Sequence, residues 1–223
     1  MMNSYLPAAL AALAVAGGGA WYYMSAQGGA EQTAISADAQ TAEAELDLDR
    51  VPDMALGDED APVEFIEYAS LTCPHCATFH EQVLPELKAD YVDTGAVRYI
   101  HREVYFDRYG LWAAMVARCG GEDRYFGMLD LLYENQSDWA TEENPADAAE
   151  MLRGLGRQAG ISGDDLEACL SDEAQAEAMI AAYEHYASED GVEATPTFII
   201  NGERYSNMPY SELAEVIDGK LEE

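Results

Sequence analysis

The sequence predicts an α/β fold in which a block of helices interrupts a single sheet. The run 63–69 is apolar and aromatic enough for a buried strand, residues 109–188 have helical spacing almost throughout, and strand character returns at 197–200. With 223 residues the chain can hold one domain with an ample core, or a small domain that carries a large insertion. The order of the elements favours a sheet with a helical insertion.

The first thirty residues have the composition of an export segment. None of them is charged, and Leu6 to Ala16 is almost wholly apolar, as in the hydrophobic region of a secretory signal. Residues 28–30 are small enough for cleavage, whereas the aromatic residues 21–23 resemble the belt that closes a membrane anchor of roughly 20 residues. We expect 1–30 to be a signal peptide or an N-terminal membrane anchor. The folded part would then lie in the periplasm or another extracytoplasmic compartment, where disulfides persist.

The chain is strongly acidic. Its formal net charge of −32 argues against nucleic acids and anionic membrane surfaces as partners, because both would repel it. The stretch from Glu31 to Asp49 is rich in Ala, Asp, Glu, Gln and Thr and has almost no large apolar residue, so it cannot bury enough surface to order itself. We expect residues 31–53 to be an acidic flexible linker.

The first part of the predicted sheet begins near residue 54. Residues 56–62 are typical of a turn, and they lead into the strand 63–69. Helical spacing follows from Ala77 to Tyr91, where Pro85 should kink the helix. A second strand is expected at 97–104.

The helical block contains apolar stripes at helical spacing. One stripe runs from Trp112 to Cys119 at positions i, i+3, i+4 and i+7, and a shorter one runs from Leu166 to Leu170. These stripes predict helices that pack against a core of their own.

Sheet structure is expected again after the helical block. The run 197–200 is strand-like, and Asn201-Gly202 is a two-residue hairpin signal that leads into 203–206. A last helix is predicted at 211–221, with Ser211 as its N-cap.

The motif Cys73-Pro74-His75-Cys76 lies where the strand 63–69 turns into the following helix. Two thiols separated by two residues can close and reopen an intramolecular disulfide. A cysteine at a helix start faces unpaired backbone N–H groups and the positive end of the helix dipole, which stabilise a thiolate over a thiol. We therefore predict Cys73 as the nucleophile.

Two other interpretations of the motif are open. Such a pair is also half of a zinc site, and His75 and His80 are close enough in sequence to take part. No second Cys-x-x-Cys or His pair follows at zinc-finger spacing, so we expect no metal. A purely structural disulfide is disfavoured, because closing so short a loop removes little entropy from the unfolded chain.

This order of elements, with the Cys-Pro-His-Cys motif at the head of a helix and Ala194-Thr195-Pro196-Thr197 before the third strand, resembles the DsbA-like branch of the thioredoxin superfamily. The resemblance extends from about Leu56 to the C terminus and implies a thioredoxin fold with an inserted α-helical domain. Residues 54–107 and 190–223 would form the thioredoxin fold, and 108–189 the helical insert. The long acidic linker and the threonine before the proline depart from the simplest members of that family.

The resemblance also implies roles for three residues. Thr195 and Pro196 match the cis-proline loop that lies against the active-site disulfide and binds an extended client. From the sequence alone, an ordinary trans proline at a strand start is the favoured alternative, and the resemblance reverses that preference. Glu67, six residues before Cys73, matches the acidic residue beneath the active site. If Glu67 is buried below Cys76, it could relay the proton that Cys76 loses or gains; otherwise it is a solvent-facing strand residue.

Pro74 and His75 would modulate the dithiol. The His75 side chain is either simply exposed in the turn, or its partly protonated imidazole stabilises the thiolate of Cys73. A stabilised thiolate favours the reduced protein and makes the disulfide form a stronger oxidant.

The other two cysteines, Cys119 and Cys169, lie on apolar helical faces of the insert. We expect a structural disulfide between them, which would close a loop of roughly 50 residues and contribute about 4 kcal/mol in the chain-entropy model. The alternative is a pair of isolated buried thiols.

Together these features predict an extracytoplasmic thiol:disulfide oxidoreductase that uses no cofactor and introduces disulfides into reduced or unfolded secreted proteins through Cys73 and Cys76. The resemblance implies a membrane quinone-linked, DsbB-like reoxidase as its partner. One alternative is a disulfide isomerase or reductase kept reduced by a membrane donor. An alternative of another class is a metal chaperone that binds through Cys73, Cys76 and His75.

Overall fold

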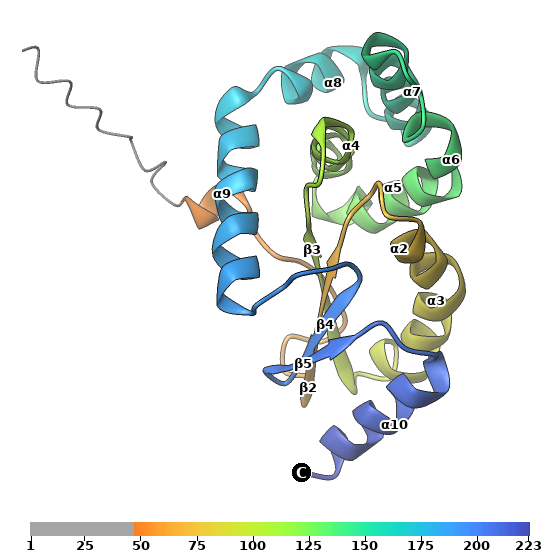
Figure 1. Cartoon of the computed structure of the whole chain (residues 1–223), viewed down its shortest axis with the longest axis vertical. Helices are drawn as coiled ribbons and strands as arrows, with labels where there is room; N and C mark the ends of the chain where they lie inside the picture. Colours follow the sequence, from red (N-terminus) through yellow and green to blue (C-terminus); the bar gives the residue numbers. More distant parts are fainter. Residues whose placement is uncertain (1–46) are drawn as a thin grey trace, which may run out of the picture. The chain divides into compact units, whose positions relative to one another are not determined.

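The computed structural model describes residues 47–223. The predicted signal peptide or anchor at 1–30 and the part of the predicted linker before Asp47 lie outside the described residues. Five strands form one sheet in the order β1-β3-β2-β4-β5 (Figure 1). They are β1 (Met54–Leu56), β2 (Val63–Ala69), β3 (Val97–Glu103), β4 (Thr197–Ile200) and β5 (Glu203–Ser206).

The central strand β2 pairs in parallel with β3 and antiparallel with β4. A parallel pair needs a crossover connection, and here a helical segment supplies it. The hairpin between β4 and β5 turns at Asn201 and Gly202, which both have positive φ, as the hairpin signal predicts. The crossover consists of α2 (Pro74–Thr78), η2 (Phe79–Val83), α3 (Leu84–Leu87) and η3 (Lys88–Val92).

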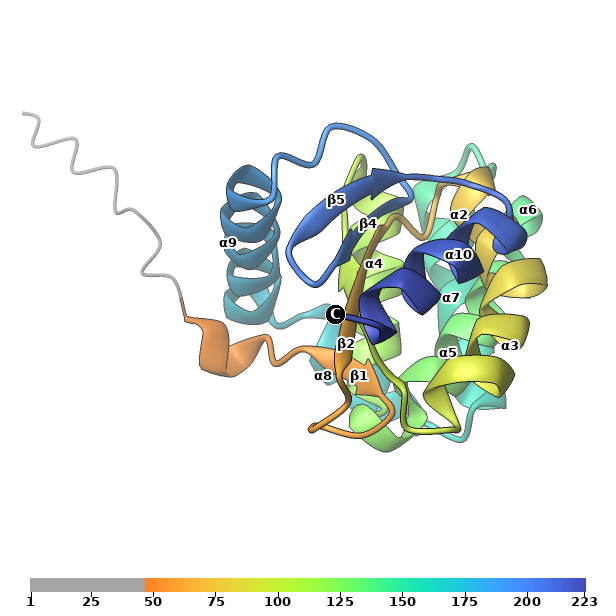
Figure 2. The same ribbon diagram turned by 90° about the horizontal axis from the view of Figure 1, so that it is seen from below.

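Helices cover both faces of the sheet (Figures 1 and 2). The crossover helices and α10 (Tyr210–Leu221) pack on one face, and α9 (Glu173–Glu189) covers the other. Because successive side chains of a strand point to opposite faces, Phe65 and Glu67 of β2 face the crossover helices, while Ile66 and Tyr68 face α9. β2 is therefore buried on both sides, and it ends directly before the dithiol.

The insert between β3 and β4 is entirely helical, so the predicted thioredoxin fold with a helical insert is confirmed. Its interior is apolar: Trp139 is fully buried, and its indole N–H donates to the carbonyl of Leu132 (2.9 Å). A disulfide joins Cys119 to Cys169. Within residues 47–223, no helix is long and apolar enough to cross a membrane. Besides α9, the insert comprises α4 (Arg108–Cys119), α5 (Glu122–Glu134), α6 (Gln136–Trp139), α7 (Pro145–Gln158) and α8 (Gly163–Leu170).

Residues 47–53 belong to the folded part, so the predicted C-terminal boundary of the linker at 53 is wrong. The short helix η1 (Leu48–Arg50) contacts α9, and Val51 is buried in the core that the insert forms. The composition of this segment does not predict that it is folded, because its few apolar side chains pack against residues far along the chain.

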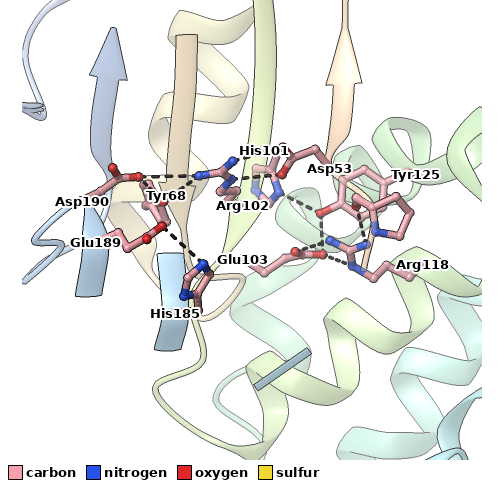
Figure 3. Close-up of polar contacts among 11 residues, drawn as sticks. Asp53, Tyr68, His101, Arg102, Glu103, Arg118, Tyr125, His185, Glu189 and Asp190 are labelled. Carbon is pink, nitrogen blue, oxygen red and sulfur yellow. Dashed lines mark hydrogen bonds and ion pairs between the residues drawn. The ribbon is translucent and has the colours of Figure 1, made fainter. Parts of the chain in front are cut away.

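Two arginines fasten this segment to β3 and to the insert (Figure 3). Arg102 makes a bidentate ion pair with Asp53, with nitrogen–oxygen distances of 3.0 and 3.1 Å. Arg118 donates to both carboxylate oxygens of Glu103 (2.7 Å each) and to the carbonyl of Pro52 (3.0 Å). Because Glu103 and Arg118 are both nearly inaccessible, each charge depends on the other for compensation.

Three local features differ from the prediction. The edge strand β1 was not predicted, because a strand of three residues is too short to show an alternation of apolar and polar side chains. The helix after the motif begins at Pro74, earlier than expected, and it has π rather than α geometry over Phe79–Val83, just before Pro85. The prediction of Ser211 as N-cap is wrong: α10 begins at Tyr210 with Pro209 in the cap position.

Candidate active site

The two cysteines of the motif lie at the junction of β2 and α2. Cys73 is the N-cap of α2 with an extended backbone (φ −88°, ψ 119°), and Pro74 occupies the start of the helix. Proline fits there because its missing N–H is one of the groups that a helix start leaves unpaired. The carbonyl of Cys73 accepts the N–H groups of Cys76 (3.1 Å) and Ala77 (3.2 Å). The turn therefore holds the Cys73 sulfur over the start of the helix, and both cysteines are free thiols.

Cys73 is half-buried, and its surroundings stabilise the thiolate. The Cys76 thiol donates to the Cys73 sulfur, the backbone N–H groups of Cys76 and His75 favour the charged form, and the nearby Thr195 side chain acts in the same direction. Together they lower the pKa of Cys73 from 9.0 to about 5, although burial acts in the opposite direction. His75 contributes here through its backbone N–H, while its side chain is exposed. At neutral pH Cys73 is a thiolate.

Cys76 has the opposite character. Its side chain is fully buried, and burial raises its pKa far above the usual range, with further increases from its hydrogen bond to Cys73 and the charges of Glu67 and Cys73. The pair is therefore polarised into an accessible thiolate and a shielded thiol, which makes Cys73 the sulfur that an incoming group meets.

Glu67 lies buried beneath this pair. Burial raises the pKa of its carboxyl from 4.5 to about 8, a hydrogen bond from the Tyr99 hydroxyl lowers it, and the charge of Cys73 raises it further. Glu67 is only 1% exposed, so the solvent-facing alternative is excluded. A carboxyl that titrates near neutral pH beside a buried thiol is suited to hold a proton for it.

The loop before β4 faces the dithiol. The Thr195-Pro196 peptide bond is cis, and the Cys73 sulfur lies 3.5 Å from the backbone oxygen of Thr195, to which it can donate only when it is protonated. The Thr195 hydroxyl is buried without a hydrogen-bond partner of good geometry, although it lies near enough to both sulfurs to lower the pKa of each. The structure thus brings the predicted residues Thr195 and Pro196 to the predicted cysteines.

Cys119 and Cys169 lie away from this site. Cys119 ends the 12-residue helix α4, whose N-cap, Asp107, accepts a hydrogen bond from Thr72 beside the dithiol. Cys119 therefore lies about 18 Å along the helix from the end that Thr72 contacts. Pro74 is exposed like His75, on the outer side of the turn.

Sequence reasoning missed three residues that shape the site. Tyr99 of β3 holds Glu67 through its hydroxyl. Gln136 of α6 donates to the carbonyls of Leu71 (2.8 Å) and Cys73 (3.0 Å). Asp107 holds Thr72 (3.0 Å). Each contact joins residues 32 or more positions apart, so no local pattern could have indicated it.

Within residues 47–223, no group of three or more His, Cys, Asp and Glu side chains is arranged to hold a metal ion.

A polarised dithiol at a helix start, a cis-proline loop against it and a helical insert between β3 and β4 define a DsbA-like protein. The family model described as Thioredoxin matches residues 49–219, and the chain belongs to this family.

Known relatives agree with this assignment. A Rickettsia bellii protein provisionally named a protein-disulfide oxidoreductase is 33% identical over 77% of this chain and 65% of its own length. Disulfide bond formation protein D of Bacillus subtilis is 26% identical, covering 74% of this chain and 76% of the relative. Among solved structures, Wolbachia pipientis alpha-DsbA1 matches with a TM-score of 0.70 and 29% identity, covering 76% of this chain and 91% of that one. The chain spans only 61 to 65% of the length of the first curated relatives that it matches.

Proposed function

We propose that this protein is an extracytoplasmic thiol:disulfide oxidoreductase that donates disulfides to reduced secreted proteins. The observation that carries the proposal is the polarised pair: Cys73 has hydrogen bonds that stabilise its thiolate, and Cys76 is buried. Because only the reduced form contains the thiolate, this stabilisation favours reduction of the Cys73–Cys76 disulfide, which makes the disulfide form an oxidant.

The reaction balances as a dithiol–disulfide exchange. A client thiolate attacks the Cys73 sulfur of the disulfide form, the bond between the two cysteines breaks, and Cys76 leaves as a thiolate. A second client thiolate then attacks the client sulfur of this mixed disulfide, and Cys73 leaves as a thiolate. Two electrons have passed from the client to the protein, and the client holds a new disulfide. Cys73 suits this last step because a low-pKa thiol is a good leaving group.

Glu67 supplies the proton that the first step requires. When Cys76 leaves as a buried thiolate, its high proton affinity draws a proton from a neighbouring acid. Glu67, whose charge acts on Cys76, holds such a proton at neutral pH because its pKa is raised to about 8. The Tyr99 hydroxyl, which donates to Glu67, keeps the carboxyl in place. On reoxidation the proton moves in the opposite direction.

The cis-proline loop is the proposed client dock. The backbone around Thr195 lies against Cys73, so an extended peptide that pairs with it would bring its own cysteine to that sulfur. The cycle needs an electron acceptor, and a membrane quinone-linked reoxidase of the DsbB type fits this requirement. Residues 1–30, which carry no charge and contain the apolar run 6–16, support an extracytoplasmic location, by export or by a membrane anchor.

A peptide-oxidation assay tests the proposal. The disulfide form is mixed with a reduced peptide that contains two cysteines, and the peptide disulfide is quantified by mass spectrometry. We expect stoichiometric oxidation by the wild type and none by Cys73→Ala. Reduced Cys76→Ala is mixed instead with the oxidised peptide: Cys73 should open the peptide disulfide, and the peptide should stay attached to Cys73 because no Cys76 is present to displace it. A double alanine variant at Cys119 and Cys169 is the control and should oxidise the peptide normally.

Two results would contradict the proposal. If Cys73→Ala oxidises the peptide at the wild-type rate, the reactive sulfur is elsewhere. If the wild type instead equilibrates towards reducing an oxidised peptide, the alternative of an isomerase or reductase kept reduced by a membrane donor replaces the oxidase.

A further inference from the structure

The turn that carries Cys73 is held from outside the thioredoxin fold. Gln136, the first residue of α6 in the helical insert, lies beside the active-site turn and is 8% exposed. Its Nε2 is 2.8 Å from the carbonyl oxygen of Leu71 and 3.0 Å from that of Cys73. Figure 1 shows α6 near α2, on the same side of the molecule.

The chemistry of the amide fixes its orientation. Both partners are carbonyls, which only accept hydrogen bonds, so the NH₂ group must face them and each of its two hydrogens has one acceptor. The two carbonyls flank Thr72, and one side chain therefore spans the residue that precedes the nucleophile.

The base from which Gln136 projects is rigid. The short helix α6 ends at Trp139, whose side chain is fully buried and whose indole N–H donates to the carbonyl of Leu132 in α5 (2.9 Å). On its other side, the turn is held by the Thr72 hydroxyl, which donates to Asp107, the N-cap of α4 (3.0 Å). The insert thus contacts the turn through two side chains, Gln136 and Asp107.

The position of the Cys73 carbonyl matters for the sulfur. This carbonyl accepts the first N–H groups of α2, from Cys76 and Ala77, so it sets where Cys73 sits at the helix start. The same residue must place its sulfur against the N–H groups of His75 and Cys76. A donor that fixes the carbonyl therefore also fixes the sulfur.

We propose that Gln136 is a positioning residue through which the helical insert holds Cys73 in the geometry that stabilises its thiolate. The inference rests on the proposed function, because it concerns the same dithiol. Without the amide, the turn would relax, the sulfur would lose alignment with the N–H groups of the helix start, and the reduced form would lose part of its advantage over the disulfide form.

The test compares Gln136→Met, which keeps the volume but has no donor, with Gln175→Met as a matched control. Gln175 makes the same kind of bond, from Nε2 to the carbonyl of Arg50 (3.0 Å), but in α9. The equilibrium constant of each protein with glutathione is measured, together with the rate at which iodoacetamide labels Cys73 at pH 6.

In Gln136→Met we expect the equilibrium to shift about tenfold towards the disulfide form, or about 30 mV, and labelling to slow; both should stay at wild-type values in Gln175→Met. The melting temperature of the reduced form should fall more than that of the disulfide form, whereas a merely structural role lowers both equally. Gln136→Asn keeps the amide on a side chain that is one carbon shorter, so its equilibrium constant and labelling rate should lie between those of the wild type and of Gln136→Met. It replaces Gln136→Met in the test if that variant does not fold.

An equilibrium constant and labelling rate unchanged by Gln136→Met would overturn the inference and leave the proposed function intact. Conversely, a wild type that does not oxidise peptides would refute the function, while the ratio between variant and wild type would still test Gln136.

Discussion

Replacing Glu67 by glutamine gives a pH-dependent gain in stability whose size follows from the structure. The carboxyl has a pKa of about 8 in the folded protein against 4.5 as its ordinary value, chiefly because it is buried. The folded state therefore holds the proton more tightly than the unfolded state. Stability is full below about pH 4.5, falls as the pH rises, and levels off above pH 8.

The magnitude comes from the difference between these two pKa values. At pH 7 the carboxyl of Glu67 is ionised in the unfolded chain but still protonated in the folded protein. This difference lowers the free energy of unfolding by about 3 kcal/mol at pH 7, and by about 5 kcal/mol above pH 8. Glutamine is neutral at every pH, and its carbonyl can still accept from the Tyr99 hydroxyl. Its amide hydrogens add a constant offset, since they need an acceptor that the carboxyl does not.

The assay is urea unfolding of reduced wild type and Glu67→Gln at several pH values between 4.5 and 8.5. The free energy of unfolding of the variant minus that of the wild type should rise by about 3 kcal/mol from pH 4.5 to pH 7. Glu64→Gln, at the exposed position of the same strand, is the control and should show no such rise. Parallel stability curves for wild type and Glu67→Gln would refute the assignment of a buried, proton-holding carboxyl.

Two further predictions concern the cysteines. Iodoacetamide should label Cys73 of the reduced protein with a midpoint near pH 5, because hydrogen bonds lower its pKa, while Cys76 stays unlabelled until the protein unfolds; peptide mapping that finds equal labelling would contradict the polarised pair. Under graded dithiothreitol, the Cys73–Cys76 disulfide should open before Cys119–Cys169, and replacing the latter pair by alanines should cost about 4 kcal/mol of unfolding free energy, so a loss below about 1 kcal/mol would count against a stabilising role.

The parts of the fold and site that sequence could predict are those with local signals. The spacing of Cys73 and Cys76 and the strand before them indicate a redox-active dithiol. Asn201-Gly202 predicts a hairpin because both residues readily adopt positive φ. The place of Thr195-Pro196 against the dithiol depended on resemblance, because nothing in the four residues around it specifies which helix they meet.

The parts that sequence could not predict depend on distant partners. Tyr99 reads as an ordinary strand aromatic, and only the fold shows that its hydroxyl meets Glu67. Gln136 lies in a polar stretch of sequence, and the two carbonyls to which its side chain donates are 63 and 65 residues earlier. Val51 was assigned to a flexible linker because its neighbours are acidic, yet the insert provides the surface that buries it. A pattern within one segment cannot report a contact made by folding.

The reduction potential of the Cys73–Cys76 pair at pH 7 tests the central claim most directly. Lowering the pKa of Cys73 from 9.0 to about 5 stabilises the reduced form at pH 7 by at most about 3 kcal/mol, and solvent screening of a half-exposed sulfur reduces this to about 1.5 kcal/mol, or roughly 30 mV. The raised pKa of buried Cys76 adds almost nothing at pH 7, because its thiol is protonated there with or without the increase. Added to the potential of thioredoxin, about −270 mV, this shift predicts a potential of about −240 mV or less negative, measured from equilibrium with glutathione. A value near or below about −270 mV, where thioredoxin acts as a reductant, would contradict the account.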